Sequence, residues 1–287
     1  MNQKDIAIFV GAISLIPLIS TGCASQQNAN SLLDYTETAE RQYEKGMDEF
    51  VDEDCVSAEK VFGEVRKAFP YSRFAVLSEL RMADCQFIQG NHAEASVLYQ
   101  QFIKAHPTHE EAHYAAFRRG LCYYEMIPGD WVVTPPPHER DQSATRDARG
   151  AFSGFLTTYP ESSWQQRAEE LLREVEDALV QHEIYVAKFY LSREDRNAAA
   201  VRLEGIRSLY PESTLVPDAM FMQALTFLEM NKLDKARRVL NEITIHFPTH
   251  YQSRRADEYL RHIGGTSAGG KRGDDGQGNP ATTRKGP

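Results

Sequence analysis

The chain has 287 residues, of which 41% are hydrophobic and 25% are charged, so it carries enough apolar sequence to bury a sizeable core. Its formal net charge is −9 and its pI is near 5.5, and no long run of lysine or arginine occurs. These properties argue against binding to nucleic-acid phosphates and point to partners of another kind.

The first 22 residues have the composition of a secretory signal peptide. The apolar stretch over residues 6–19 is interrupted by Pro17 and is too short to span a bilayer, but it suits the apolar region of an export signal. The leader ends "LISTGC", which resembles a bacterial lipobox, and this resemblance implies lipid attachment at Cys23. An ordinary signal peptide followed by an incidental cysteine is the alternative.

Cys23 and the residues after it indicate the cellular location of the chain and its membrane anchor. Ala24 follows Cys23, and the lipobox resemblance then implies sorting to the outer membrane, with the chain on its periplasmic face. Several acyl chains, such as palmitate, on one residue would hold the protein at the membrane. Residues 23–31 are polar and are predicted to form a flexible tether.

A repeated helical pattern fills the chain from residue 32 to residue 264. Five prolines follow an aromatic residue or histidine, and they stand at Pro70, Pro107, Pro160, Pro211 and Pro248. Apolar residues recur at fixed distances before each proline on one helical face. The same small residue stands twelve positions before each proline, at Ala58, Ala95, Ala148, Ala199 and Ala236. The pattern predicts one helix pair repeated five times.

Further small residues mark where neighbouring helices must approach closely. Such residues precede the prolines by 24 positions, at Gly46, Ala83, Ala187 and Ala224. The second helices of three repeats are predicted to begin at a capping residue, Asp54, Asn91 or Asp195, whose side chain accepts a hydrogen bond from the first free backbone amides.

The spacing of the repeat prolines shows that the third and fourth repeats contain extra residues. They lie 37, 53, 51 and 37 residues apart. The third repeat gains a Pro- and Gly-containing insertion at about residues 127–143, which cannot be helix interior. The fourth repeat has no helix breaker between residues 163 and 193, so its extra 14 residues are predicted to lengthen one helix by about four turns. Residues 265–287 are glycine-rich and are predicted to be disordered.

The cysteines form no metal-binding or disulfide pattern. Cys55, Cys85 and Cys122 include no Cys-x-x-Cys pair, and Cys85 and Cys122 occupy equivalent repeat positions. They are interpreted as small buried thiols in helix interfaces, with a disulfide or a metal site as the alternatives.

The helix pairs, with Gly or Ala at close-contact positions and a terminal aromatic-Pro, resemble tetratricopeptide repeats. The fold expected is all-α, with five tetratricopeptide-like helix pairs in a right-handed superhelix. Behind a lipobox, with an insertion in the third repeat and a long helix in the fourth, the pattern resembles the BamD family of lipoproteins in the outer-membrane β-barrel assembly machine. The segments "HPTHEEAHYAAFRRGLCYY", "ERDQSATRDARGAFSGFLTTYPES", "EIYVAKFYLSRED" and "AAAVRLEGIRSLYPES" carry this likeness.

The resemblance implies a periplasmic scaffold without enzymatic activity or cofactor. It implies docking of the barrel-forming subunit BamA through the C-terminal repeats, and contact of the N-terminal repeats with another lipoprotein such as BamC or with unfolded barrel substrates. Arg202 matches a family position for the BamA contact, with Arg196, Arg207, Arg237 and Arg238 nearby in sequence. A solvated basic face is the alternative for these arginines.

A peptide groove is the second surface expected. In tetratricopeptide superhelices the first helix of each repeat lines the concave face, and in repeats one and two this places Tyr43, Met47, Phe50, Leu80, Asp84 and Phe87 there. A mostly apolar groove suits an extended segment ending in an aromatic residue. Packing between stacked helices is the alternative interpretation.

Two other functions stay open from the sequence. A lipoprotein that coordinates cell-wall synthesis or another envelope complex could use similar repeats. A zinc peptidase is the remote alternative, because residues 109–113 read "HEEAH", and an HExxH motif binds zinc when both histidines face the metal from one helix. A phosphate loop at "GTSAGGKR" is excluded, because the following Ser or Thr and the flanking strand and helix are missing.

Overall fold

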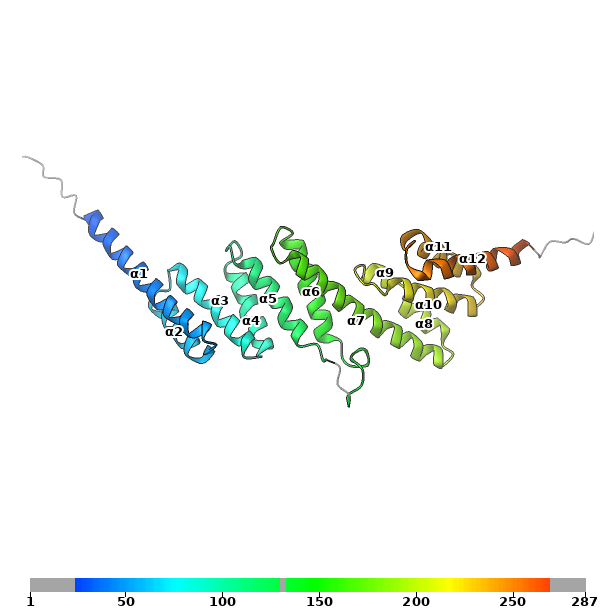
Figure 1. Cartoon of the computed structure of the whole chain (residues 1–287), viewed down its shortest axis with the longest axis horizontal. Coiled ribbons are helices and arrows are strands. Elements are labelled where there is room, and N and C mark those ends of the chain that lie inside the picture. Colours follow the sequence, from blue (N-terminus) through cyan, green and yellow to red (C-terminus); the bar gives the residue numbers. More distant parts are fainter. Residues whose placement is uncertain (1–23, 130–132, 269–287) are drawn as a thin grey trace, which may run out of the picture. The chain divides into compact units, whose positions relative to one another are not determined.

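The computed structural model describes residues 24–129 and 133–268, with side chains placed for residues 33–129 and 133–264. The regular structure within these ranges is entirely helical, which confirms the all-α prediction (Figure 1). The chain divides into two compact units, one ending at Met82 and one beginning at Ala83. Each unit is described by itself.

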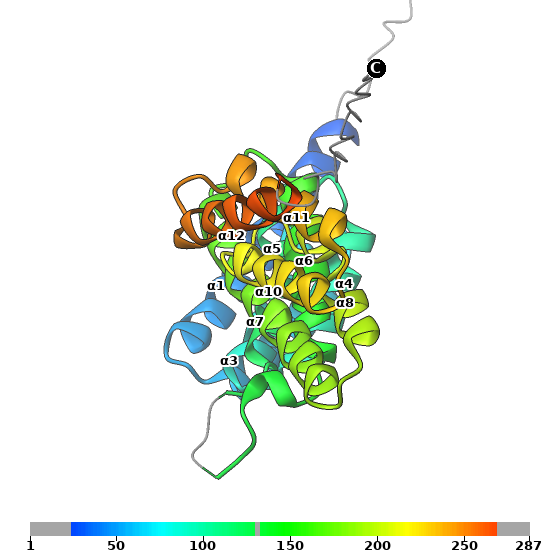
Figure 2. The same ribbon diagram turned by 90° about the vertical axis from the view of Figure 1, so that its right-hand side faces the viewer.

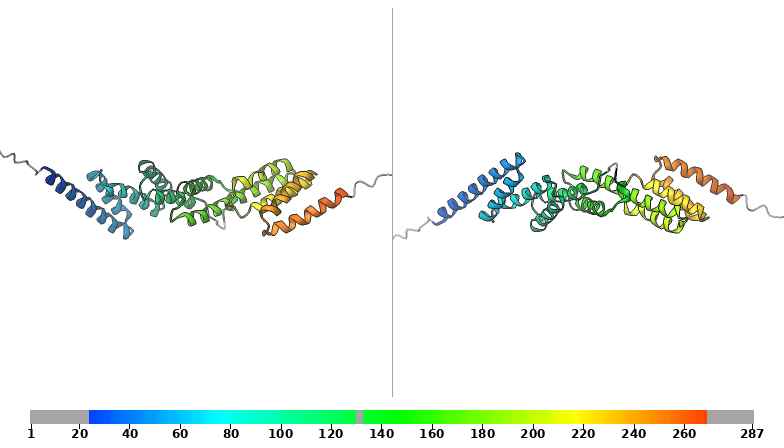
Figure 3. Two further views of the ribbon diagram at one scale, coloured as in Figure 1. Left: turned by 90° about the horizontal axis from the view of Figure 1, so that it is seen from above. Right: turned by 90° about the horizontal axis from the view of Figure 1, so that it is seen from below.

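The first unit contains α1 (Ala24–Val51), α2 (Cys55–Ala68) and the first part of α3 (Arg73–Ile88). Helix α1 is continuous from Ala24 (Figure 3), so the prediction of a flexible tether over residues 23–31 is wrong for the part that the structure describes. The physical reason is that residues 24–31 contain no proline or glycine and lead directly into the amphipathic part of the helix.

The core of the first unit is small and largely aromatic. Ala39, Val65, Phe69 and Phe74 are buried together, and the Tyr43 ring packs against this cluster. The start of α2 is set by Asp54, whose carboxylate accepts a hydrogen bond of 3.0 Å from the backbone amide of Ser57.

The second unit continues from α3 as a series of packed helices. The remaining elements are α4 (His92–Ala105), α5 (Ala112–Glu125), the 3₁₀ helix η1 (Pro137–Glu139), α6 (Ser143–Thr158), α7 (Gln165–Ser192), α8 (Arg196–Leu203), α9 (Ile206–Leu209), α10 (Val216–Glu229), α11 (Leu233–His246) and α12 (Tyr251–Ala268). From α4 to α8 and from α9 to α12, each helix packs against the next α-helix in the chain, and α10 also contacts α7 and α12, between which it is seen in Figure 2.

The five predicted helix pairs are present within the described residues, and α12 covers the last one. The pairs are α1/α2, α3/α4, α5/α6, α7/α8 and α10/α11. The small residue twelve positions before each repeat proline is fully buried in every pair, at Ala58, Ala95, Ala148, Ala199 and Ala236. The second helices therefore pack against their neighbours through the same position each time.

Gly120 fills the close-approach position of the third repeat. A Cβ atom at Gly120 would lie 2.6 Å from Cε1 of Phe152, and one at Gly46 would lie 2.6 Å from Cε1 of Phe62. Both phenylalanine rings are fully buried. Each glycine thus allows an aromatic ring of the partner helix to rest directly on the backbone.

Helix α7 has 28 residues, twice the length of α10, which confirms that the extra sequence of the fourth repeat lengthens one helix. Its first half packs into one hydrophobic cluster through Leu171 and Val175, and its second half packs into another through Val180 and Ala187. The long helix therefore joins the cores of neighbouring repeats within the second unit.

The second helix of the fourth repeat is broken. It ends as α8 at Leu203, and the chain resumes as the single turn α9 at Ile206. Gly205 between them has a φ of +84°, a left-handed conformation that glycine adopts without steric strain. The repeat pattern predicts one second helix leading to Pro211, and the break at Gly205 differs from this prediction.

The caps and chain ends differ from expectation in two places. Asp195 caps α8 by accepting from the amide of Ala198, but the Asn91 side chain makes no cap bond and donates to Oε1 of Gln86 instead. Helix α12 extends through the predicted start of the glycine-rich tail to Ala268. Glycine lowers helix stability without forbidding it, which accounts for this extension.

The predicted signal peptide, Cys23 and residues 269–287 lie outside the described residues. None of the described helices is both long enough and apolar enough to cross a bilayer.

Candidate interaction sites

The six residues predicted to line a groove have different environments. Tyr43, Met47, Phe50 and Leu80 belong to the first unit, and Asp84 and Phe87 belong to the second. Leu80 is fully buried, and the Tyr43 ring lies against the rings of Phe62 and Phe74. Met47 and Phe50 are partly exposed. The groove prediction is therefore wrong for Leu80, because this side chain fills the helix interface and presents nothing to a ligand.

Asp84 is the buried centre of a polar network instead of a groove residue. Its Oδ1 accepts hydrogen bonds from the hydroxyl groups of Tyr99, at 2.5 Å, and Tyr114, at 2.9 Å. The guanidinium of Arg118 lies 3.8 Å from the same oxygen and donates to the Tyr99 hydroxyl. The groove assignment of Asp84 is wrong, because the carboxylate is used to join α3, α4 and α5.

Phe87 extends this network at its edge. The Arg118 guanidinium lies over the Phe87 ring, 3.9 Å from its centroid. Burial, followed by the nearby charge of Asp84, raises the pKa of Tyr99 far above its ordinary value. Tyr99 is therefore a neutral hydrogen-bond donor at any physiological pH.

A second buried carboxylate, that of Glu176, connects α7 to α6 and to the turn before α10. Glu176 on α7 pairs with Nε of Arg149 on α6 at 2.9 Å, and its other oxygen accepts the backbone amide of Glu212 at 2.8 Å. Arg149 also donates to the carbonyl of Leu209 and lies over the Tyr210 ring. One carboxylate thus fixes α6, α7 and the turn before α10 relative to one another.

Arg202, the residue predicted for the BamA contact, lies at the end of α8 with 46% of its side chain exposed. Its guanidinium is 3.5 Å from the carboxylate of Glu183 on α7. Of its sequence neighbours, Arg196, Arg207 and Arg237 each pair with an acidic residue, Glu229, Glu242 and Asp234 respectively. The structure therefore brings these arginines to the surface as members of separate ion pairs.

The HExxH motif does not have the geometry of a zinc site. His109 precedes α5, which begins at Ala112, so His109 and His113 do not project from one face of a single helix. Nδ1 of His113 lies 2.9 Å from Oγ of Ser162. The side chains that the structure places contain no group of three potential metal ligands. The zinc-peptidase alternative therefore loses the geometric premise on which it was based.

His109 has a structural role that recurs in all five repeats. The residue two positions after each repeat proline accepts a hydrogen bond from a backbone amide two or three residues later, at the start of the following helix. These five residues are Ser72, His109, Ser162, Ser213 and His250, with bonds of 3.1 to 3.3 Å. The sequence signal was present, since only serine and histidine occupy this position.

Two replacements of His109 test whether its side chain stabilises the chain by accepting the amide of Glu111. His109→Ala leaves the amide of Glu111 without its acceptor and should lower the free energy of unfolding by about 1 kcal/mol. His109→Ser restores the capping group of the other repeats and should recover most of that loss. Urea unfolding followed by circular dichroism measures both variants, and equal losses for serine and alanine would contradict the capping role.

The three cysteines in the described part of the chain are buried free thiols, as interpreted from the sequence. Burial raises the pKa of the Cys122 thiol to about 12. A thiol of this kind stays protonated and is a poor nucleophile and metal ligand.

The insertion of the third repeat lies between α5 and α6 and is held against α7. The backbone carbonyl of His138 is 2.8 Å from Nδ1 of His182, and the His138 ring packs on Tyr185. Arg140 donates to the carbonyls of Pro135 and Gly129. These contacts fix the described part of the loop beside the longest helix of the unit.

A family model described as "YfiO: Outer membrane lipoprotein" matches residues 36–243, a segment that includes all five helix pairs except the ends of α1 and α11. Among curated proteins, the "Outer membrane protein assembly factor BamD" of Neisseria gonorrhoeae is 26% identical over 241 residues, covering 80% of this chain and 88% of that protein. The protein of the same name from Caulobacter vibrioides is 25% identical, covering 86% of this chain and 78% of its own length.

Among solved structures, a tetratricopeptide repeat protein from Parabacteroides merdae aligns with 81% of this chain and 75% of its own. The sequence identity is 17% and the TM-score is 0.37. The helix pairs themselves define the fold.

Proposed function

The chain belongs to the YfiO family of outer membrane lipoproteins, and on this basis we propose that it is a scaffold of the β-barrel assembly machine that helps to assemble and insert barrel proteins. The observation that supports this most strongly is the extent of the family match, which runs through the helix pairs from residue 36 to residue 243. Relatives named as outer membrane protein assembly factors also match over most of their length.

We propose that the mature chain is anchored to the periplasmic face of the outer membrane through lipid on Cys23. Its function is structural, without catalysis or a cofactor, and its partners are a BamA-like barrel subunit, other lipoproteins of the machine and unfolded barrel substrates. The resemblance of "LISTGC" to a lipobox supports the anchor. The use of Asp84 and Glu176 in buried networks, and of His109 as a cap, supports a scaffold over an enzyme.

The α7/α8 pair is the surface that we propose for the BamA-like subunit, with Arg202 at its centre. Arg202 is half exposed, whereas its partner Glu183 is largely covered. The Arg202 end of this pair is open to solvent, so the arginine can exchange its carboxylate for one on a partner.

We expect charge reversal at Arg202 to weaken this contact without unfolding the chain. In Arg202→Glu the new carboxylate faces Glu183 and repels an acidic partner. Quantitative co-purification of the barrel subunit from detergent-solubilised membranes should fall strongly. Lys60→Glu, an exposed reversal on α2 and so away from the α7/α8 surface, is the matched control and should leave recovery unchanged.

The triple variant Arg196→Glu/Arg202→Glu/Arg237→Glu extends this test across α8 and α11. If this variant has a normal circular dichroism spectrum and still recovers as much barrel subunit as the wild type does, the α7/α8 surface is not the binding surface.

A further inference from the structure

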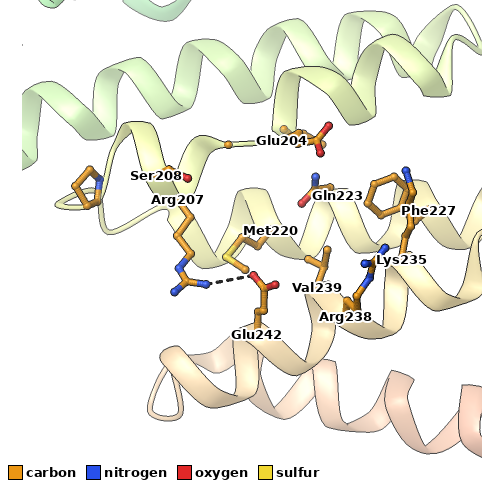
Figure 4. A pocket seen from close by; sticks show the side chains of 13 residues that line it. Glu204, Arg207, Ser208, Met220, Gln223, Phe227, Lys235, Arg238, Val239 and Glu242 are labelled. Carbon is orange, nitrogen blue, oxygen red and sulfur yellow. Dashed lines mark hydrogen bonds and ion pairs between the residues drawn. The ribbon is translucent and has the colours of Figure 1, made fainter.

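A cavity of about 710 Å³ lies in the second unit, between the broken second helix of the fourth repeat and the last helix pair. Figure 4 shows its walls, which come from α8, α9, α10 and α11. The break at Gly205 shapes one wall, because the chain turns there instead of continuing as a helix. Its apolar lining is formed by Leu203, Met220, Phe227 and Val239.

Two cations on α11, Lys235 and Arg238, line this cavity. Arg207 at the other end of the cavity is paired with Glu242 at 3.2 Å, as the dashed line in Figure 4 shows. Lys235 and Arg238 have no carboxylate within ion-pair distance among the side chains that the structure places, although Nζ of Lys235 lies 5.5 Å from the centroid of the Phe227 ring. The unpaired positive charge is thus concentrated at the α11 wall.

Gln223 is the third feature of the cavity, and it is independent of the charges. Its side chain on α10 is only 8% exposed, yet its amide makes no hydrogen bond to any side chain or backbone group in the described part of the chain. In Figure 4 the amide lies among the lining residues, between Glu204 and Phe227. The amide is accessible from the cavity, so it is available to a ligand that brings its own donor and acceptor.

We infer that this cavity binds an extended acidic segment of a partner protein. Lys235 and Arg238 hold a carboxylate of the segment, Gln223 bonds to its peptide group, and the floor around Met220 takes a neighbouring apolar side chain. A small inorganic anion would use the two cations but neither the apolar floor nor the amide. Glu204 on the opposite wall repels a second carboxylate, which orients the bound acid toward α11.

This inference rests on the proposed scaffold function, for which it supplies a second contact. The site is separate from Arg202, which faces α7 and does not line the cavity. A partner held at both places would contact α8 from two sides.

The test measures fluorescence anisotropy of a fluorescein-labelled hexapeptide of alternating leucine and aspartate, titrated with the purified mature chain. We expect saturable binding that weakens at 0.5 M salt, about tenfold weaker binding by Lys235→Glu/Arg238→Glu, and weaker binding by Gln223→Leu. Arg254→Glu, an exposed reversal on α12, is the matched control and should bind as the wild type does. A peptide of alternating leucine and lysine should not bind.

Absence of saturable binding, equal binding by the double variant, or equal binding of the lysine peptide would overturn the inference. Circular dichroism establishes that each variant is folded. Co-purification of the barrel subunit with the double variant separates the two proposals. If the subunit is recovered while the wild-type chain binds no acidic peptide, the cavity inference fails and the scaffold function stands.

Discussion

Glu176→Ala should lower the free energy of unfolding by about 3 to 5 kcal/mol, which is the usual result of removing one member of a buried ion pair. Glu176 is almost fully buried, pairs with Arg149 at 2.9 Å and accepts the amide of Glu212 at 2.8 Å. Without the carboxylate, a largely desolvated guanidinium and a backbone donor both lose their acceptor. Differential scanning calorimetry should show the thermal midpoint falling by about 10 °C.

Two further variants test whether the loss of stability in Glu176→Ala comes from breaking this buried ion pair. Glu170→Ala removes an exposed carboxylate from the same helix, where it contacts Arg167 and Gln166 one turn away, and it should leave the thermal midpoint unchanged. Arg149→Met/Glu176→Leu replaces both charges by apolar groups and should be more stable than Glu176→Ala alone. Equal midpoints for Glu176→Ala and Glu170→Ala would contradict the role given to the network.

Asp84→Ala should destabilise the second unit by about 3 kcal/mol, because two tyrosine hydroxyls and Arg118 then lose a buried acceptor. Tyr99→Phe and Tyr114→Phe should each cost about 1 kcal/mol, since each removes a single hydrogen bond. Asp147→Ala, which changes an exposed aspartate on α6, is the control and should have no effect. Urea unfolding measures all four.

The pH dependence of this network has a defined sign. The pKa of Tyr99 is raised in the folded state, so the stabilisation is fully present below the unfolded value of about 10 and is lost as the pH rises above it. Asp84→Ala removes the second cause of that raised pKa, so its unfolding free energy should depend less on pH in this range. If Asp84 faced a ligand groove, as the sequence suggested, its removal would change ligand binding and leave stability nearly intact.

The repeat pattern was readable from the sequence because each repeat buries the same positions. Ala95 and, four positions later on the same helical face, Tyr99 are fully buried, and the equivalent residues of the other repeats are buried in the same way. The length of α7 was also predictable, because nothing between residues 163 and 193 can end a helix. These features depend on periodicity and on helix breakers, which are local properties.

Features that depend on tertiary contacts were missed. Gly120 was not recognised as the close-approach residue of the third repeat, because counting back from Pro160 crosses the insertion. The break at Gly205 was missed because glycine is compatible with a helix, and only packing decides whether the chain turns there. Asp84 was placed in a groove because helical phase alone does not reveal that Tyr99 and Tyr114 would reach it.

The most direct measurement of the central claim is affinity purification of the tagged, lipid-anchored chain from detergent-solubilised membranes, followed by identification of the proteins recovered in stoichiometric amounts. A scaffold of the barrel assembly machine should bring down an outer-membrane barrel protein that carries periplasmic domains, and it should lose that protein in the Arg202→Glu variant. Recovery of cell-wall synthesis proteins or another envelope complex, with no barrel protein present, would contradict the account.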